Sequence, residues 1–268
     1  MYKVRKIAYI SLISGFGNNL FQISAARKME ALGYRIKFDI SASKKKKFDF
    51  QNIPELNHYY NCRVALWTKY IPSPIGRNGW ISRWFLKFAL GLTLHIDLTS
   101  AGELPKDLKQ RYFIVGYWQR KDVAEYLPEC NSLKNLDIKP RVAIHVRRGD
   151  MVGNIIKPMD SFFRACLNLY HKEVEIKKLP IVVYTDDPEY CNSQLVLGED
   201  FQVMQGGDAF DDFCGLMTSS HIIISRSTYS WWAAFLSNSQ VFCPTDWGFD
   251  QKIEDSIIIP EFWTVVQG

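Results

Sequence analysis

The sequence predicts an α/β protein in which parallel strands alternate with helices. The first observation is an apolar, β-prone run at residues 7–13, which leads through a Gly- and Asn-rich turn into apolar residues at helical spacing. The second is that the order of strand and helix begins again after residue 138 and continues towards the end of the chain. Alternation of this kind is typical of a doubly wound sheet with helices on both faces.

The first part of the chain begins as a β-α-β unit. Its predicted elements are a strand at 7–13, a turn at "SGFGNN", a helix at 20–32 that Gly33 ends, and a strand in "YRIKFDI". Between residues 41 and 108 the pattern is weaker, and it predicts one amphipathic helix, at 81–92. The segment "RYFIVGYWQR" is then typical of a strand followed by an aromatic turn.

The second part of the chain repeats the alternation more clearly. We predict strands at 141–146, 179–187, 201–205, 221–225 and 240–244, and helices at 160–171, 210–218 and 229–236. A Pro residue follows Lys139 between the two parts and is the predicted hinge. The sequence therefore predicts two domains, 1–138 and 139–268.

Composition excludes several classes of protein. The chain has 268 residues, of which 47% are hydrophobic and 23% charged, as in ordinary globular proteins. Its six cysteines form no CxxC pair and have no His at zinc-ligand spacing, which argues against a disulfide framework and a structural metal. The N-terminal apolar run has no cleavage site, and no window has the length and purity of a membrane span. We therefore expect a cytoplasmic protein.

Charge is distributed unevenly along the chain. Residues 1–138 are strongly basic, whereas the remainder is acidic. This asymmetry indicates two modules with different partners, the first meeting phosphates or an anionic membrane face. The alternative for the run "KKKK" at 44–47 is a solvated loop. A nucleic-acid-binding protein is a second alternative, although the acidic second part and the lack of repeated basic and aromatic clusters argue against it.

Four polar clusters follow predicted strands: "GFGNN", "HVRRGD", "TDD" and "SRSTYS". Ligands of open α/β sheets bind outside the carboxyl ends of the strands, so these clusters predict a binding cleft. In "HVRRGD", strand alternation places His145 and Arg147 on one face and Arg148 on the other. One arginine could enter the cleft and hold diphosphate oxygens, while the next pairs with a carboxylate such as Asp150. The alternative is a structural Arg–Asp pair that caps the strand.

The cluster "SRSTYS" places Ser225, Ser227 and Thr228 at a helix N-terminus, which favours a phosphate group. The alternative is that these residues are simply N-caps. The following tryptophans, Trp231 and Trp232, could stack on a base or sugar or could pack in the core.

The cluster "TDD" places Asp186 and Asp187 where carboxylates could accept hydrogen bonds from ribose hydroxyls or guanine N–H groups. Metal binding and a helix cap are the alternatives. The glycines of "GFGNN" allow close backbone approach, and Asn18 offers a hydrogen bond.

Five segments together resemble the bacterial and animal α1,2-fucosyltransferase family: "SGFGNNLFQISAARKMEALGYRIKFD", "VGYWQ", "VAIHVRRGDM", "YTDDPEYC" and "SRSTYSWWAAFLS". They occur in matching order across nearly the whole chain. The motif "HxRRGD" is also shared with α1,6- and protein O-fucosyltransferases, whereas the paired tryptophans are more specific. The resemblance implies a GT-B architecture with two Rossmann-like domains facing across a cleft, GDP-β-L-fucose as donor, inversion at the anomeric carbon and no essential metal.

The resemblance also implies roles for individual residues. Arg147 resembles the arginine that contacts the β-phosphate of the donor, and His145 its neighbour on the nucleotide side. Asp186 and Asp187 match an acidic pair near the nucleotide. Ser227 and Thr228 match hydroxyls near the phosphates, and Asn18 matches an asparagine at the cleft. The chain departs from the family at Phe16, Asn19 and Arg226, and Arg226 adds a cation beside the phosphate site.

The implied reaction is attack of a galactose-type hydroxyl on fucose C1 as GDP leaves from the opposite face, through an oxocarbenium-like transition state. Asp150 is one candidate for the general base and Asp160 another, while a third possibility is that Asn18 only positions the hydroxyl. The acceptor is predicted to be a lipid-linked oligosaccharide, with residues 81–92 resting on anionic headgroups or, alternatively, packed inside the first domain. Another nucleotide-sugar transferase on the same architecture is the alternative function.

Overall fold

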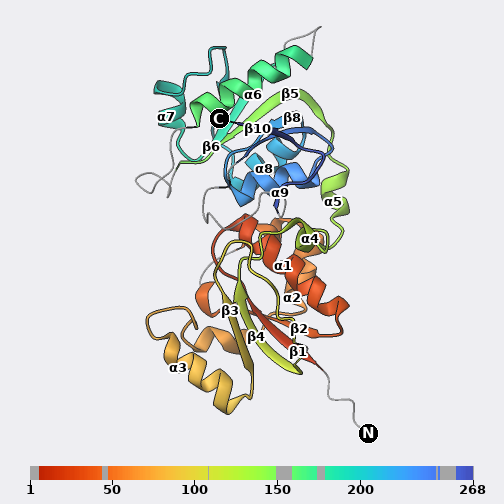
Figure 1. The fold of residues 1–268 in the computed structure, drawn as a ribbon, viewed down its shortest axis with the longest axis vertical. Helices are drawn as coiled ribbons and strands as arrows, with labels where there is room; N and C mark the ends of the chain where they lie inside the picture. The colour runs from red at the N-terminus through yellow and green to blue at the C-terminus, as the bar shows by residue number, and fades with distance from the viewer. Residues whose placement is uncertain are drawn as a thin grey trace. The chain divides into compact units, whose positions relative to one another are not determined.

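The computed structural model describes residues 6–43, 48–107, 109–148, 159–173, 179–245, 247 and 258–267. The chain divides into two compact units, Met1–Ser132 (unit 1) and Leu133–Gly268 (unit 2), each built on a parallel sheet (Figure 1). This division lies six residues before the predicted one at residue 138, and Lys139 and Pro140, the predicted hinge, are the first residues of a strand in unit 2. The predicted α/β class with two Rossmann-like units is confirmed.

Unit 1 contains a four-stranded parallel sheet in the order β2-β1-β4-β3. Its strands are β1 (Ile7–Ser11), β2 (Arg35–Asp39), β3 (Thr93–Asp97) and β4 (Arg111–Gly116). Its helices are α1 (Phe16–Ala31), α2 (Pro54–Asn61), α3 (Gly79–Trp84) and α4 (Lys121–Ala124), with α5 (Asn131–Lys134) at the division between the units. Shorter helical turns are η1 (Ser41–Ser43), η2 (Asp49–Asn52), η3 (Leu66–Tyr70) and the π-turn η4 (Phe85–Ala89).

Helix α1 begins four residues earlier than the sequence predicts, so most of "GFGNN" is helical and not a turn. The reason is hydrogen bonding by Asn19, because the N-cap residue, Gly15, has no side chain that could cap the helix. The Asn19 side-chain amide donates to the carbonyl oxygen of Ile13 at 2.9 Å, and the Asn19 backbone N–H donates to that of Gly15 at 3.0 Å. The asparagine therefore closes the first turn that the hydrophobic spacing alone does not predict.

The weakly patterned segment of unit 1 holds the other differences. The helix predicted at 81–92 is instead α3 followed by η4, and Gly91, with a φ of 61°, lies just beyond its end. Strand β3 is not predicted by the sequence, because it lies at the sheet edge and is only partly buried. Edge strands lack the continuous apolar run of a central parallel strand.

Unit 2 contains a six-stranded parallel sheet in the order β10-β9-β8-β5-β6-β7. Its strands are β5 (Lys139–Val146), β6 (Ile181–Thr185), β7 (Gln202–Val203), β8 (Ser219–Ile223), β9 (Gln240–Pro244) and β10 (Thr264–Val266). Its further helices are α6 (Asp160–Glu173), α7 (Pro188–Ser193), α8 (Ala209–Met217) and α9 (Thr228–Leu236). Apart from β10 and α7, these elements match the predicted ones in type and order.

The core of unit 2 explains the apolar strand that ends in arginines. Alternate side chains of β5, including Val142 and Ile144, pack with Phe163 and Leu167 of α6 on one face of the sheet. Helices α8 and α9 lie on the other face (Figure 1). A central strand covered on both faces is apolar where it is covered, here at Val142–Ile144, so the polar residues of β5 lie towards its two ends, with His145 buried near the carboxyl end.

The paired tryptophans of α9 belong to this core. Trp231 and Trp232 are fully buried, and the indole N–H of Trp231 donates to the carbonyl oxygen of Ile258 at 3.0 Å. The idea that they stack on a base or sugar is therefore wrong. No helix among the ranges that the structure describes combines the length and the apolar character needed to cross a membrane.

Candidate functional site

Three of the four polar clusters lie at the carboxyl edge of the sheet in unit 2. Strand β5 lies between β8 and β6, and all three run parallel. Pairing of Val146 with Thr185 and of Ile144 with Ile223 brings the residues after each strand to the same edge. The sequence clusters "HVRRGD", "TDD" and "SRSTYS" are thus brought together.

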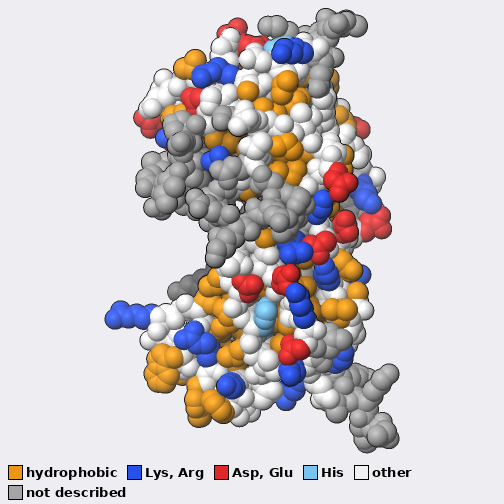
Figure 2. Space-filling view, in the orientation of Figure 1, with side chains coloured by type: hydrophobic (Ala, Val, Ile, Leu, Met, Phe, Trp, Pro, Cys, Tyr) orange, Lys and Arg blue, Asp and Glu red, His pale blue; other side chains and the backbone are white. Residues whose placement is uncertain are grey.

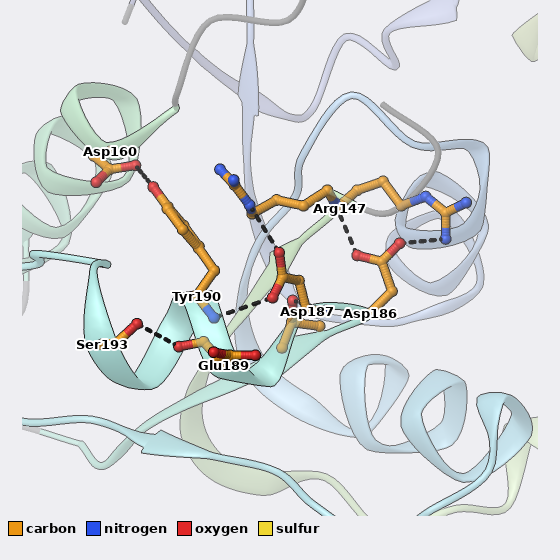
Figure 3. Close-up of polar contacts among 9 residues, drawn as sticks. Arg147, Asp160, Asp186, Asp187, Glu189, Tyr190 and Ser193 are labelled. Carbon is orange, nitrogen blue, oxygen red and sulfur yellow. Dashed lines mark hydrogen bonds and ion pairs between the residues drawn. The ribbon is translucent and has the colours of Figure 1, made fainter. Parts of the chain in front are cut away.

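Arg147 and Asp186 form an ion pair at this edge. The guanidinium of Arg147 lies 2.8 Å from Asp186 Oδ2, and the backbone N–H of Arg148 donates to Asp186 Oδ1 at 2.8 Å (Figure 3). Both side chains of the ion pair are about one-third exposed. Asp186 is therefore fixed from the backbone of β5 while its other oxygen holds a solvent-accessible arginine.

Arg148 is held by a carboxylate and by an aromatic ring. Its Nε donates to Asp187 Oδ2 at 3.2 Å, and its guanidinium carbon lies 3.4 Å from the centroid of the Tyr190 ring. The Tyr190 hydroxyl in turn donates to Asp160 Oδ1 at 2.9 Å (Figure 3). A planar guanidinium stacked on an aromatic ring and bonded at one edge has little freedom to reorient.

Asp187 also begins helix α7. Its Oδ1 accepts a hydrogen bond from the backbone N–H of Tyr190 at 3.0 Å, so it is the N-cap, as one alternative for "TDD" proposes. The four carboxylate oxygens of Asp186 and Asp187 all accept hydrogen bonds or ion pairs within the unit. The arginine partners are thus these aspartates. Asp150, which the sequence offers as a partner and a base, lies outside the described residues.

His145 connects β5 to the loop that follows β8. Its Nδ1 lies 2.8 Å from Ser225 Oγ, and its ring lies 5.3 Å from that of Tyr229. Burial, and secondarily the charge of Arg147, lowers the pKa of His145 to about 3. The imidazole is therefore neutral at physiological pH and does not serve as a cation for a phosphate.

The N-terminus of α9 completes this edge. Ser227 is its N-cap, and the Ser227 hydroxyl accepts a hydrogen bond from the backbone N–H of Tyr229 at 3.3 Å. Arg226 and Thr228 flank it and are partly exposed. Since the next two turns of α9 are buried, the core fixes the helix with its positive dipole end at the carboxyl edge.

A second polar group lies at the carboxyl edge of the sheet in unit 1. The Asn18 amide donates to Ser14 Oγ at 3.0 Å, and its oxygen accepts from Gln119 Nε2 at 2.8 Å. Ser14 follows β1, and Gln119 follows the adjacent strand β4. Ser14 and Trp118 have φ values of 65° and 49°, an uncommon conformation for residues other than glycine.

A buried glutamine, Gln22, makes hydrogen bonds near the segments that carry Ser14, Asn18 and Gln119 and connects the turn after β1 to the end of β4. Gln22 Oε1 accepts from the Ile13 backbone N–H and from the Asn19 amide at 3.0 Å each, while Gln22 Nε2 donates to Gly116 O at 3.1 Å. Sequence reasoning did not single out Gln119, Gln22 or Tyr190. The available signal for Gln119 was its place directly after a predicted strand.

The residues predicted from the sequence thus belong to two groups. Asn18 is in unit 1, and the others that the structure describes, His145, Arg147, Arg148, Asp186, Asp187, Arg226, Ser227 and Thr228, are in unit 2. Their roles toward a ligand, and the cleft between the units, stay predictions. In the described parts of the chain, no three His, Cys, Asp or Glu side chains gather closely enough to hold a metal ion.

The model of glycosyl transferase family 11 matches residues 107–258, which include every charged residue of the edge in unit 2. The chain belongs to this family. The family predicted from the sequence motifs is therefore confirmed.

Two curated relatives come from Escherichia coli. An α-1,2-colitosyltransferase is 24% identical over 182 aligned residues, which cover 57% of this chain and 62% of that protein. The chain therefore spans less than two-thirds of the length of this relative. The O-antigen biosynthesis glycosyltransferase WbnK is 23% identical, with 89% of this chain and 94% of that protein covered.

Among solved structures, the chain is similar to the iron-containing dodecameric glycosyltransferase TibC from enterotoxigenic E. coli. The TM-score is 0.50 at 13% identity, and the match covers 98% of this chain and 62% of that chain. At this identity the likeness concerns the fold alone. It agrees with the two Rossmann-like α/β units of this family 11 member.

Proposed function

We propose that this protein is an inverting α1,2-fucosyltransferase that moves L-fucose from GDP-fucose to a galactose-type hydroxyl of an oligosaccharide. The observation that carries the proposal is the pairing of Arg147 and Arg148 with Asp186 and Asp187, beside the N-terminus of α9. Membership of family 11 and the motif resemblance support the choice of fucose.

Arg147 is proposed to bind the β-phosphate of the donor. Its ion pair with Asp186 is partly exposed, and pairs of this kind contribute only about 0–1 kcal/mol. A diphosphate offers bidentate oxygens with more charge, so Arg147 can leave Asp186 or share its guanidinium with the donor. As the bond to fucose breaks, negative charge grows on the diphosphate, and Arg147 stabilises it.

The neighbouring residues are assigned supporting roles. The positive end of the α9 dipole and the hydroxyls of Ser227 and Thr228 are proposed to stabilise the negative charge on the diphosphate. Arg226 is proposed to add a cation to the same group. Arg148, His145, Asp186 and Asp187 are proposed to line the nucleotide side. Because guanidinium groups and a helix dipole meet the leaving-group charge, the proposed mechanism needs no metal.

The sugar side of the reaction is assigned to unit 1. Asn18 is proposed to orient the attacking hydroxyl with the amide that Ser14 and Gln119 fix. The hydroxyl attacks fucose C1, the bond to the β-phosphate oxygen breaks, and GDP leaves with the bonding electrons. Asp150 is the proposed acceptor of the hydroxyl proton, since Asp160 is already bonded to Tyr190.

The acceptor is proposed to be a lipid-linked oligosaccharide at the cytoplasmic face of a membrane, in the synthesis of a surface polysaccharide. The name of WbnK associates that relative with O-antigen biosynthesis and supports this choice. A nucleotide-activated colitose is the second candidate donor, because one relative is an α-1,2-colitosyltransferase. Colitose lacks the C3 hydroxyl of fucose, and a site that hydrogen-bonds this hydroxyl discriminates strongly against its absence.

A donor panel tests the proposal. The full chain is incubated with galactose-terminated oligosaccharides and with GDP-fucose, GDP-colitose, GDP-mannose or UDP-sugars, and nucleotide release is measured with and without a chelator. The expected result is chelator-insensitive release of GDP from GDP-fucose and an α1→2 product linkage by NMR. Turnover with GDP-colitose alone selects the second candidate, and turnover only with UDP-sugars overturns both.

A further inference from the structure

Three exposed aromatic side chains form one stripe on unit 1. Trp80, Trp84 and Phe88 are spaced four residues apart along α3 and η4 and are 63%, 60% and 65% exposed. The ring centroids of Trp84 and Phe88 are 5.9 Å apart, so these two rings are neighbours, and Trp80 lies one helical turn before Trp84. Figure 2 shows hydrophobic and basic side chains together over the region where Figure 1 places α3.

The opposite face of the same segment is anchored to the unit. Leu86 is fully buried in a cluster with Phe113 and Val115 of strand β4. The Ser82 hydroxyl donates to Pro72 O at 2.5 Å, and Arg83 donates to Pro74 O at 3.1 Å. Because these contacts fix one face of the segment against unit 1, the opposite face, which carries the aromatic stripe, is held towards the solvent. Single exposed apolar residues are ordinary, whereas a contiguous stripe marks an interaction surface.

The segment that carries the stripe contains basic residues and no acidic ones. Residues 56–96 contain five Lys or Arg residues and no Asp or Glu, namely Arg63, Lys69, Arg77, Arg83 and Lys87. Arg63 is paired with Glu30, and the basic rim of the stripe is Arg77 and Lys87. Arg77 and Lys87 are exposed, and Lys87 Nζ lies 5.4 Å from the centroid of the Phe88 ring. Tryptophan with surrounding lysine and arginine is the composition that places a segment at the headgroup level of an anionic bilayer.

We propose that this aromatic stripe and its basic rim, the docking surface, bind the protein to a bilayer of anionic phospholipids. A second copy of the chain fits the surface less well, because a two-fold interface would set the basic rims against each other. The rings enter the headgroup region while the cations remain with the phosphates. The inference concerns unit 1 alone and does not depend on which sugar is transferred.

Sedimentation with vesicles tests the proposal. The full chain is mixed with vesicles of phosphatidylcholine, or of phosphatidylcholine with phosphatidylglycerol, at low and at physiological salt. We expect binding to the anionic vesicles that weakens as salt rises, with a blue shift of tryptophan emission. Equal binding to both vesicle types would overturn the anionic part of the proposal, and no binding at low salt would overturn it entirely.

Two sets of variants locate the contact. Replacing Trp80, Trp84 and Phe88 by Ser, or Arg77 and Lys87 by Glu, is expected to weaken binding more than about tenfold. Arg83 is left unchanged because it holds Pro74. The matched controls are Phe262→Ser and Lys172→Glu, both at exposed positions of unit 2, which are expected to bind as the wild type does.

Two outcomes contradict the docking surface directly. The first is unchanged binding by a variant set that keeps its circular dichroism spectrum. The second is a dimer in sedimentation velocity that the serine variants convert to a monomer, because a second copy would then cover the stripe. Transfer to a short soluble acceptor is expected to be unaffected by the variants, so failure of the docking surface and failure of the proposed reaction give different results.

Discussion

The polar group described at the carboxyl edge of unit 2 contains arginines paired with aspartates, whereas the group around Asn18 in unit 1 contains serine, asparagine and glutamine. In unit 2, Arg147 and Asp186 form an ion pair that a stronger anion can rearrange. In unit 1, Asn18 is fixed by two neutral hydrogen bonds. Two sheets of the same type thus carry different chemistry: the group in unit 2 is charged and the group around Asn18 is neutral, which is why the donor is proposed to bind at the first and the acceptor at the second.

The largest expected effect comes from breaking the charged edge. Arg147→Ala is expected to lower kcat by about a hundredfold, equivalent to about 3 kcal/mol, because leaving-group charge is no longer stabilised. The thermal unfolding midpoint is expected to stay near that of the wild type, since the ion pair is partly exposed. Arg164→Ala on α6 is the matched control, and an equal loss of activity in that variant would contradict the role of Arg147.

The two units also differ in their buried titratable groups. His145 in β5 has a pKa lowered to about 3, chiefly by burial. Asp39 at the end of β2 has a raised pKa because it is buried, although Ser11 and Ser41 donate hydrogen bonds that lower it. A buried base and a buried acid respond to pH in opposite directions.

Acidification is therefore expected to act oppositely on the two units. His145 stays neutral in the folded state while the unfolded chain gains a proton below pH 6.5, so unit 2 loses up to about 1.4 kcal/mol per pH unit between pH 6 and 3. Asp39 retains its proton to higher pH when folded, so unit 1 loses stability as pH rises through that raised pKa.

Amide hydrogen exchange measures this contrast unit by unit. Protection factors of β5 and β2, corrected for intrinsic exchange rates, are compared between pH 7 and 4.5. His145→Asn is expected to flatten the pH response of unit 2 only, and Asp39→Asn that of unit 1 only. A parallel pH response of both units in the wild type would contradict the assignment.

The charged edge was largely predictable from the sequence, and the contacts within it were not. The strands at 141–146 and 181–185 are continuous apolar runs that end in Arg and Asp, which is enough to predict the edge. That Arg147 meets Asp186 depends on β6 being the neighbour of β5 in a particular register. Nothing local to either motif fixes that pairing, so Asp150, near in sequence, was an equally reasonable partner.

The neutral edge was harder to predict for a different reason. Asn18 was singled out, but its partner Gln119 lies 101 residues away and carries no charge, and the segment "VGYWQ" that it ends does not indicate a contact with Asn18. The amphipathic helix at 81–92 was predicted with the wrong bounds, since its exposed face is aromatic and the hydrophobic period does not distinguish the inner face from the outer one.

A smaller loss of activity is expected when Arg147 is kept and only the charge of its partner Asp186 is removed. Asp186→Asn keeps an oxygen for the backbone N–H of Arg148 but ends the ion pair with Arg147. Loss of a negative charge is expected to tighten GDP binding severalfold, while loss of orientation lowers kcat by about tenfold. Calorimetry with GDP and initial rates separate the two, with Asp200→Asn as the exposed control. Weaker GDP binding together with lower kcat would contradict the expected gain in affinity, because the carboxylate of Asp186 would then attract the nucleotide more than it competes for Arg147.

The smallest expected effect tests the neutral edge. Gln119→Glu has the same shape but cannot donate to Asn18 Oδ1, so the Asn18 amide loses one of the two bonds that orient it. One lost hydrogen bond of about 1 kcal/mol predicts a fivefold rise in the acceptor KM, with GDP affinity unchanged. Gln110→Glu makes the same charge change at an exposed position of unit 1 and is the control. Gln119→Glu could instead weaken GDP binding and leave the acceptor KM unchanged. The Asn18 amide would then act on the nucleotide, and the division into a charged donor edge and a neutral acceptor edge would be wrong.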